Sequence, residues 1–418
     1  MTLDEDLEEA AGNPAPGDPV SPGLRRARAW LSRAAEPGTI DFWRYVMDVG
    51  PVEAVRRLRA GQAPERVRSL VGARAEQDAT LVDLTRAERC GARLVVPEDD
   101  EWPALALHAL TVAVSAEPDD PKHQSDRTRA PVPPLALWVL GAARLDELVD
   151  RSVAIVGSRA STAYGEHVAG ELGHQLGERG WTIVSGGAFG IDAAAHRGAL
   201  AAGAPTVAVL ACGVDRPYPA AHGALFHRIA ETGLLVSEWP PGCAPLRHRF
   251  LVRNRLIAAL TRGTVVVEAA ARSGAQATAQ RARRLGREVL VVPGPVTSAM
   301  SVGCHELLRD REAGATLVAS AAHVIEAVGG IGTDLADPVE RPAGPRDGLS
   351  DLAARVLDAC PVRTGVSPER LAAIAGCDVL EVLRVLPALE LADLVQWTGT
   401  GWRLHPPPRR TGGPGAAA

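Results

Sequence analysis

Residues 152–200 read SVAIVGSRASTAYGEHVAGELGHQLGERGWTIVSGGAFGIDAAAHRGAL and set the fold class of the chain. An apolar run at 152–156 precedes an amphipathic stretch at 164–179, and the same two patterns recur at 182–184 and 190–202. Short runs rich in β-branched residues predict strands, and the longer stretches predict helices. Strands that alternate with helices form βαβ units, so these residues predict a parallel sheet.

The alternation continues toward the C-terminus. Further strands are predicted at 206–210, 234–236, 264–267 and 288–292, and further helices at 219–232, 252–261, 275–286 and 302–311. The predicted strands are apolar on both faces, as expected of strands that helices cover on both sides. The predicted fold is therefore α/β, an extended Rossmann-like, doubly wound parallel sheet.

Composition shifts divide the rest of the chain, because polar stretches rich in proline and glycine flank the α/β region. The predicted regions are a disordered acidic N-terminus (1–25), a small helical domain (26–111), a linker (112–134), the Rossmann-like domain (135–330), a second linker (331–349), a winged-helix domain (350–405) and a disordered tail (406–418). The turn–helix pieces of the helical domain resemble helix-hairpin-helix or sterile-alpha-motif units.

The winged-helix prediction rests on helical stretches at 351–359, 368–375 and 378–391, followed by a hairpin of 394–397 with 402–404. The third helix carries three acidic residues against one arginine. Pro387 is expected to kink or split it. Such a helix would read the major groove of DNA poorly, so protein contact or structural packing is the favoured role of this domain.

Small, glycine-rich loops follow the predicted strands, whose carboxyl ends form the ligand-binding edge of a doubly wound sheet. Three of these loops are Gly157-Ser158-Arg159, Ser185-Gly186-Gly187 and Ser273-Gly274. Loops that open into helices present unpaired N–H groups and a positive dipole end, which suit phosphate. Several such loops at one edge predict an anion site, although any single one is equally explained as a turn of the chain.

No enzyme motif accompanies these loops. The sequence has neither GxGxxG nor GxxxxGK[ST], which disfavours a dinucleotide enzyme and a P-loop ATPase. The serines lack a G-x-S-x-G elbow, and Cys304 and His305 lack partner ligands at metal spacing. Asp192 and His196, four residues apart, could form a general-base pair, but a capping aspartate and a structural histidine are favoured. We predict no catalytic residue, metal or cofactor, and we expect Trp181 and Phe226 to fill the core.

The formal net charge of −5 argues against a nucleic-acid binder only until its distribution is considered. Residues 1–20 hold six acidic residues and no basic one, whereas residues 240–290 hold ten arginines and two acidic residues. Within that segment, Arg247, Arg249, Phe250, Arg253, Asn254 and Arg255 form one cluster. Arginines grip phosphates and an aromatic ring stacks a base, a combination used for single strands. The alternative is a solvated arginine face.

Other features bound the class of protein. No apolar run approaches the length of a transmembrane helix, and the acidic N-terminus argues against a signal peptide. The six cysteines are scattered without a CxxC pair, which fits reduced thiols and a cytoplasmic location. Only one basic residue is lysine, which indicates a GC-rich genome, so the number of arginines by itself proves little.

Several motifs in register resemble the DprA/Smf family (DNA processing protein A) over about 135–328. They are IVGSR (155–159), Tyr164-Gly165, VSGGAFGIDAAAH (184–196), Tyr218-Pro219, LLVSE (234–238), FLVRNRLIAAL (250–260), VVEAAARSGAQATA (266–279) and VPGPV (292–296). The resemblance implies a non-enzymatic protein that binds and protects single-stranded DNA and loads RecA onto it in natural transformation and homologous recombination. It also implies a homodimer formed through the Rossmann-like domain.

The resemblance assigns roles to the residues already singled out. Arg159 would hold a phosphate and Phe250 would stack a base, with Arg247, Arg253 and Asn254 in the same pocket. The loops at 185–187 and 273–274 would supply backbone donors. The chain departs from the family at Phe189, where members often carry a basic residue, and at Gly303-Cys304-His305, where members usually read Gly-Thr-Asn.

The predicted DNA-binding set is Gly157, Ser158, Arg159, Ser185, Gly186, Gly187, Arg247, Arg249, Phe250, Arg253, Asn254, Arg255, Ser273 and Gly274. The rival interpretation is a Rossmann-like sensor of a nucleotide ligand or a phosphoribohydrolase-like enzyme. The helix predicted at 275–286 begins without the glutamate that such hydrolases carry, which disfavours this alternative.

Overall fold

The computed structural model describes residues 20–72, 74, 78–117, 130–271, 273–312, 314–330, 334 and 346–406. It divides into two compact units, Met1–Asp337 and Pro338–Ala418, which are considered separately. Most of the predicted disordered ends, much of both predicted linkers, and Arg272 of the arginine-rich segment lie outside the described residues. Within the described residues, no helix is long and apolar enough to cross a membrane.

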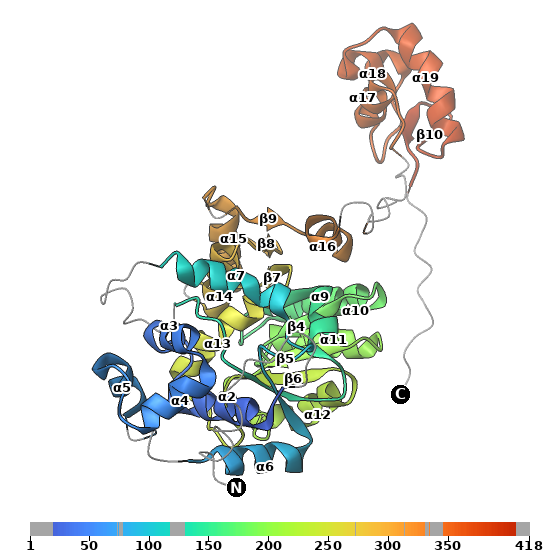
Figure 1. Cartoon of the computed structure of the whole chain (residues 1–418). Helices are drawn as coiled ribbons and strands as arrows, with labels where there is room; N and C mark the ends of the chain where they lie inside the picture. The colour runs from blue at the N-terminus through green and yellow to red at the C-terminus, as the bar shows by residue number, and fades with distance from the viewer. Residues whose placement is uncertain are drawn as a thin grey trace, which may run out of the picture. The chain divides into compact units, whose positions relative to one another are not determined.

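In the described part of the first unit, nine strands form one sheet (Figure 1). They are β1 (Ala92–Val95), β2 (Leu137–Leu140), β3 (Ser152–Gly157), β4 (Thr182–Ser185), β5 (Thr206–Val209), β6 (Leu234–Ser237), β7 (Gly263–Val267), β8 (Glu288–Val291) and β9 (Thr316–Leu317). Their order is β1-β2-β6-β5-β4-β3-β7-β8-β9. Strand β2 pairs antiparallel with β1 and β6, and all other neighbours are parallel.

The sheet reverses its winding direction between β3 and β7. From β3 the chain adds β4, β5 and β6 on one side, and it then crosses to add β7, β8 and β9 on the other. The two strands end together, with Gly157 opposite Val267. Connections that leave two neighbouring strands in opposite directions open a crevice at their carboxyl ends. This predicted doubly wound topology is confirmed.

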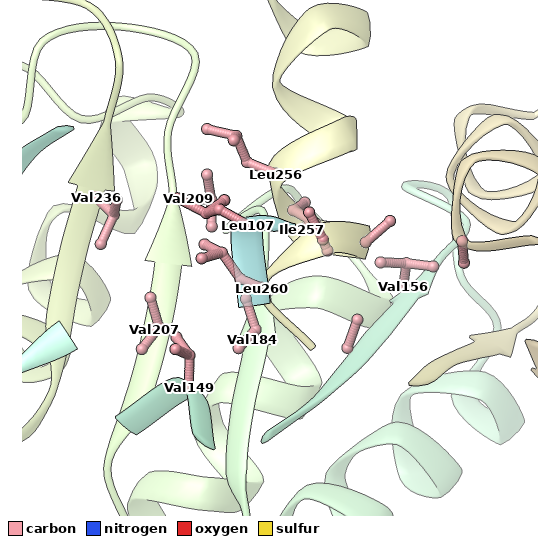
Figure 2. Packing of buried hydrophobic residues seen from close by; sticks show 14 of the residues in the cluster. Leu107, Val149, Val156, Val184, Val207, Val209, Val236, Leu256, Ile257 and Leu260 are labelled. Carbon is pink, nitrogen blue, oxygen red and sulfur yellow. The ribbon is translucent and has the colours of Figure 1, made fainter. Parts of the chain in front are cut away.

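Helices cover both faces of the sheet. The helices on one face are α10 (Ala163–Glu178), α11 (Ile191–Ala201) and α16 (Ala321–Val328), and those on the other are α7 (Ala104–Ser115), α9 (Leu145–Asp150), α13 (Arg247–Ala259) and α14 (Gly274–Arg284). Adjacent strand residues such as Ile183 and Val184 enter opposite cores. Figure 2 shows Leu256, Ile257 and Leu260 facing the strands. The predicted burial of both strand faces is confirmed.

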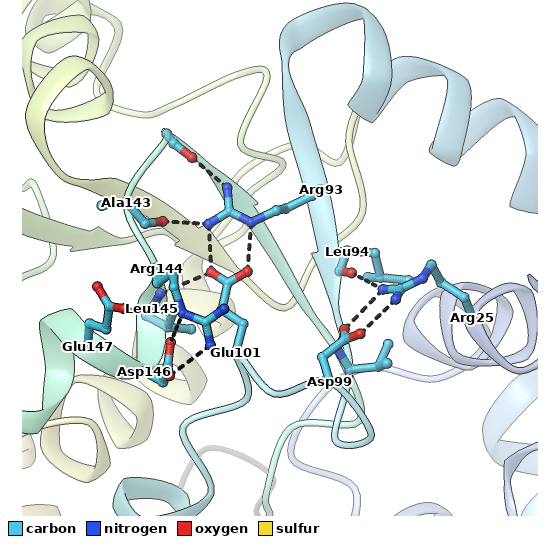
Figure 3. A network of polar contacts seen from close by, with 12 residues as sticks. Arg25, Arg93, Leu94, Asp99, Glu101, Ala143, Arg144, Leu145, Asp146 and Glu147 are labelled. Atoms are coloured by element: carbon cyan, nitrogen blue, oxygen red, sulfur yellow. Dashed lines mark hydrogen bonds and ion pairs between the residues drawn. The ribbon is translucent and has the colours of Figure 1, made fainter. Parts of the chain in front are cut away.

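The structure differs from the predicted separate helical domain at 26–111. Helices α2 (Pro22–Ala34), α3 (Ile40–Val49), α4 (Pro51–Arg59), α5 (Glu65–Val71) and α6 (Thr80–Cys90) occupy this region. Helices α2 to α5 share a small core, but β1 lies in the large sheet and α2 begins before residue 26. Arg25 pairs with Asp99 at 2.6 Å and Arg93 pairs with Glu101 at 2.6 Å (Figure 3). These pairs hold α2 and β1 to the segments around them.

The six strands predicted between 152 and 292 are confirmed, whereas β1, β2 and β9 were not predicted. Helix α12 (Gly223–Thr232) and α15 (Val302–Arg309) also lie where helices were predicted. Helix α13 begins at Arg247 rather than at 252, so the predicted arginine cluster lies on a helix.

The second unit contains α17 (Asp351–Ala359), α18 (Pro368–Ala375), α19 (Val379–Leu391) and a hairpin of β10 (Val395–Trp397) with β11 (Trp402–Leu404). Helix α19 continues through Pro387, so the helix is not split there; a kink at this residue stays a prediction. Leu386 and Leu389 are buried in the core of this unit, and their packing outweighs the hydrogen bond that proline cannot donate. The winged-helix assignment stays a prediction.

Candidate functional site

A cleft of about 920 Å³ opens at the carboxyl ends of β3 and β7, where the winding reverses. The loop after β3, the N-terminal half of α13 and the start of α14 line it. Of the predicted set, nine residues line this cleft: Gly157, Ser158, Arg159, Arg247, Phe250, Arg253, Asn254, Ser273 and Gly274. The structure thus brings together residues that are more than one hundred positions apart in the sequence.

Helix α13 presents one face to the cleft. Arg247, Phe250, Asn254 and Ile257 recur at intervals of three or four residues, so they lie on the same side of the helix. Arg247 is exposed and forms no ion pair with the described residues, and the Asn254 amide has no hydrogen-bond partner among them. This face therefore offers a cation and an unsatisfied amide to a ligand.

Arg253 reaches the floor of the cleft and is only 3% exposed. Its guanidinium donates to the carbonyl of Val209, while its Nε is buried without a partner. Burial lowers the pKa of Arg253 to about 10, so it remains charged at neutral pH. A Cβ on Gly186 would lie 2.4 Å from its Nη1, so this guanidinium requires glycine at that position.

Asp192 is the one carboxylic acid among the described residues that line the cleft. Its Oδ2 accepts hydrogen bonds from the N–H groups of Gly186 at 3.2 Å and Ala188 at 3.3 Å. Burial raises the pKa of Asp192, and the charge of Arg253 opposes that shift. Two N–H groups of the loop after β4 are therefore already bonded to a carboxylate of the protein itself.

Ser185, Gly186 and Gly187 of the predicted set do not line the cleft. The buried Ser185 hydroxyl donates to the carbonyl of Ile155 at 2.6 Å. The carbonyl of Gly187 lies 3.0 Å from Nδ1 of His222. These residues shape the loop that supports Arg253 and do not face a ligand.

Two arginines of the predicted cluster also face elsewhere. Arg255, 2% exposed, forms a bidentate pair with the carboxylate of Glu238 at 2.5 and 2.7 Å. Arg249 pairs with Glu36 at 2.6 Å and lies over the ring of Trp239. The prediction is corrected for both residues, because acidic partners from distant segments neutralise them inside the protein.

The contact between Asp192 and His196 that their spacing allows is not formed. Nδ1 of His196 lies 2.7 Å from the Thr206 hydroxyl, which itself donates to the carbonyl of Ile183. The hydroxyl has one proton, so Nδ1 must be the donor to it, and Nε2 is left buried without a partner. Burial lowers the pKa of His196 to about 3, so this histidine is neutral and structural, as favoured from the sequence.

His196 gives a pH prediction. The His196 imidazole is protonated only near pH 3 in the folded protein, whereas in the unfolded chain it is protonated near pH 6.5. Stability from the neutral ring is therefore complete above about pH 6.5 and is lost as the pH falls toward 3. We expect the stability gap between wild type and His196→Gln to shrink on acidification, as measured by denaturant unfolding at several pH values. A gap that stays constant from neutral to acidic pH would contradict this assignment.

Glu268 braces the loop that carries Arg159. The backbone of Glu268 has φ 56°, a left-handed conformation that a non-glycine residue adopts only when its surroundings hold it. Its carbonyl accepts the N–H of Ser158 at 2.9 Å, and its carboxylate accepts the N–H of Thr162 at 2.9 Å and the Thr162 hydroxyl. Both ends of the loop from Ser158 to Thr162 are thereby fixed at the switch point.

Arg159, Phe250 and Tyr218 stand next to one another at the cleft mouth. The Arg159 guanidinium lies 5.3 Å from the centre of the Phe250 ring. The Tyr218 and Phe250 rings meet edge to face, with their centres 5.9 Å apart. Arg159 and Tyr218 are exposed, and Arg159 forms no ion pair with the described residues. The mouth of the cleft thus combines a cation with two aromatic rings.

The start of α14 closes the opposite wall. The Ser273 hydroxyl accepts a hydrogen bond from the N–H of Gln276 at 3.3 Å, and a Cβ on Gly274 would meet open space. The N–H groups of this first turn carry the positive end of the helix dipole. The cleft is therefore positive on the α13 wall and polar, with anion-suited amides, on the α14 wall.

The sequence did not place several of the lining residues in the DNA-binding set: Asp192, Tyr218, His248, Thr278 and Met300. Tyr218 belongs to the Tyr-Pro motif and His248 to the arginine-rich segment, so both were detectable. Thr278 lies in the motif at 266–279, whereas Met300 carried no signal. Cys304 is buried and burial raises its thiol pKa to about 11, while His305 lies 3.0 Å from the carbonyl of Gly294. No group of three or more metal-binding side chains occurs among the described residues.

The family model described as DNA recombination-mediator protein A matches residues 94–329, more than half of the chain. The chain belongs to this family. The recombination-mediator match begins inside β1, so it includes residues that the sequence predicted to belong to a separate helical domain. The resemblance to DprA/Smf proteins is thereby confirmed.

Individual relatives agree. A DNA processing protein DprA from Mycobacterium tuberculosis is 49% identical over 379 residues, which cover 91% of this chain and 94% of the relative. The crystal structure of DprA from Streptococcus pneumoniae has a TM-score of 0.57 at 28% identity, covering 73% of this chain and 98% of that one. A further structure is that of Helicobacter pylori DprA, which is described by its single-stranded DNA binding mode. The match covers 46% of this chain and 86% of the Helicobacter chain, with 31% identity and a TM-score of 0.42.

Proposed function

We propose that the cleft binds single-stranded DNA and that the protein is a non-enzymatic mediator that protects the strand and loads RecA onto it. One observation carries the proposal. Arg159 and Arg247, both exposed and without ion pairs among the described residues, flank the Phe250 ring at the mouth of a cleft whose lining includes one acid. Unpaired arginines around an aromatic ring are what a strand of phosphates and bases requires.

Each group has a distinct task in this proposal. Arg159 and Arg247 bind phosphates, and the buried charge of Arg253 draws the backbone into the cleft. Phe250 stacks one base, and the Asn254 amide bonds a base edge or a phosphate. The first-turn amides of α14 supply further donors to phosphate. Apart from Asn254, the contacts in this set go to phosphates or to the flat face of a base, so binding is largely independent of sequence.

The finer parts of the proposal rest on the DprA/Smf resemblance. They are action in natural transformation and homologous recombination, a homodimer through the Rossmann-like domain, and a cytoplasmic location. A RecA-dependent strand-exchange assay on DNA coated with single-strand binding protein tests the mediator role. We expect this protein to shorten the lag before exchange, and an unchanged lag with a protein that binds the DNA would reject RecA loading while leaving DNA binding intact.

Salt should weaken binding to an oligothymidylate. Each phosphate contact releases counterions, and single strands lose about 0.7 in the logarithmic slope per contact. Counting the buried charge of Arg253 together with the two phosphate-binding arginines, we expect the logarithm of the association constant to fall with a slope of about −2 against the logarithm of salt. Fluorescence anisotropy measures this slope, and duplex competitor should displace the strand poorly. A slope near zero would rule out the phosphate grip.

Phe250→Ala should weaken binding by about 1–3 kcal/mol, the worth of one stacked base. Phe250 also packs beside Trp239 and Val252, so Phe250→Leu serves as a control that keeps apolar volume without a stacking ring. Phe250→Trp should bind at least as well as wild type. If Phe250→Ala binds oligothymidylate as wild type does, Phe250 does not stack a base.

A nucleotide-cleaving enzyme is the second candidate, because Asp192 lines the cleft and burial raises its pKa. Its Oδ2 already accepts two backbone hydrogen bonds, which is the geometry of a structural carboxylate. Incubation with nucleoside monophosphates separates the two functions. We expect no free base, whereas steady release of base that Asp192→Asn abolishes would favour the enzyme.

A further inference from the structure

Two aromatic side chains next to the cleft are exposed without a role in the proposed site. Phe189 is 47% exposed and Tyr218 is 48% exposed. The chain has only four phenylalanines and three tyrosines, and two of these seven rings are exposed to solvent close to the same cleft. Tyr164, the other exposed member of this group, donates its hydroxyl to the carbonyl of Pro293, whereas the Tyr218 hydroxyl has no partner among the described residues.

Phe189 is held in place from behind. Its ring meets the ring of His222 edge-on, with centres 4.5 Å apart. His222 is buried and fixed by the contact of its Nδ1 with the carbonyl of Gly187, and the buried Phe226 ring lies beyond it. A ring that is backed by a fixed neighbour and open on its outer side loses little freedom when a flat ligand stacks on it.

These rings lie on loops that also contribute residues to the cleft. Tyr218 lines the cleft and touches Phe250, and Phe189 follows Ala188, which also lines it. Phe189 lies in the loop after β4, and Tyr218 and His222 lie in the segment after β5, so the two loops are neighbours at the same sheet edge. Arg216, exposed two residues before Tyr218, adds positive charge to this segment. We call Tyr218, His222 and Phe189 the aromatic rim.

We propose that the aromatic rim is a second base-stacking subsite, which takes the nucleotide next to the one on Phe250. The inference rests on the proposed function and extends it from one base to a run of successive bases. Successive bases on successive aromatic rings are a sequence-tolerant way to hold a single strand, because every base has a flat face.

The test compares oligothymidylates of about 4 and about 16 nucleotides, which span the usual site sizes of single-strand binders. The double variant Phe189→Ala/Tyr218→Ala should bind the longer strand more weakly than wild type does. For each base that is no longer stacked, we expect affinity to fall by a factor of between about 5 and about 150. Phe189→Trp and Tyr218→Phe keep the rings and should bind as wild type does. Both rings are about half exposed and each touches one neighbouring ring, so the melting temperature should fall only slightly.

The outcomes distinguish failure of the second stacking subsite from failure of the proposed binding of single-stranded DNA. If wild type binds neither strand, the proposed function fails. If wild type binds and Phe250→Ala weakens binding, but the double variant binds both strands as wild type does, the second subsite alone is overturned. A loss that Phe189→Trp fails to avoid would also overturn it, because the ring would then not be the group that matters.

Discussion

Replacing Arg255 by methionine should lower the free energy of unfolding by about 3–5 kcal/mol, because it leaves a buried carboxylate without its cation. Glu238 is 4% exposed, and Arg255 supplies both of its charge-assisted hydrogen bonds while also donating to the carbonyl of Val132 at 2.8 Å. Denaturant unfolding of wild type and variant measures the difference. A variant as stable as wild type would contradict the structural role of this pair.

The matched control removes both charges. In Arg255→Met/Glu238→Met, no ion remains buried, and apolar side chains of similar size can replace an internal ion pair at little cost. We expect this double variant to recover most of the lost stability. Oligothymidylate affinity, measured where each variant is folded, should stay at the wild-type value, because Arg255 does not line the cleft.

The double variant Arg159→Ala/Arg247→Ala should behave in the opposite way. Both arginines are exposed, so stability should change little, while affinity for single strands of any sequence should fall by about two orders of magnitude or more. The slope of binding against salt should become shallower by about 1.4, the share of two phosphate contacts. Anisotropy titrations at several salt concentrations, together with thermal unfolding, measure both quantities.

Net charge alone could weaken DNA binding, so this experiment needs a control of equal charge. Arg68→Ala/Arg89→Ala removes two exposed arginines from α5 and α6, neither of which lines the cleft. It should keep the wild-type affinity and salt slope. If both double variants lose affinity equally, binding depends on overall charge and not on the cleft.

The contrast between Arg255 and Arg159 marks the limit of sequence analysis here. Charge counting within a window finds the arginine-rich segment, but it cannot find the acids that neutralise its members. Glu36 is 213 residues from Arg249 in the sequence and Glu238 precedes Arg255 by 17. Because the predicted helix began at 252, the segment also had no defined faces. The fold brings these acids to Arg249 and Arg255 and leaves Arg247 at the cleft.

The strands were predictable for a physical reason. Strands covered by helices on both sides are apolar at every position, and runs such as those of β3 and β7 show this directly. The glycine-rich loops at their ends were also visible, but the use of their backbone donors was not. Asp192 accepts hydrogen bonds from two N–H groups of the loop after β4, whereas residues of the first turn of α14 line the cleft.

The central claim is that a single strand lies in the cleft between β3 and β7. Photocrosslinking with an oligothymidylate that carries 5-iododeoxyuridine tests it most directly, because the activated base couples to an aromatic ring stacked on it. Mass spectrometry of the tryptic digest should find the nucleotide on the peptide that contains Phe250, and high salt during irradiation should reduce the yield. Crosslinks confined to residues 346–406, with none at the cleft, would contradict the claim.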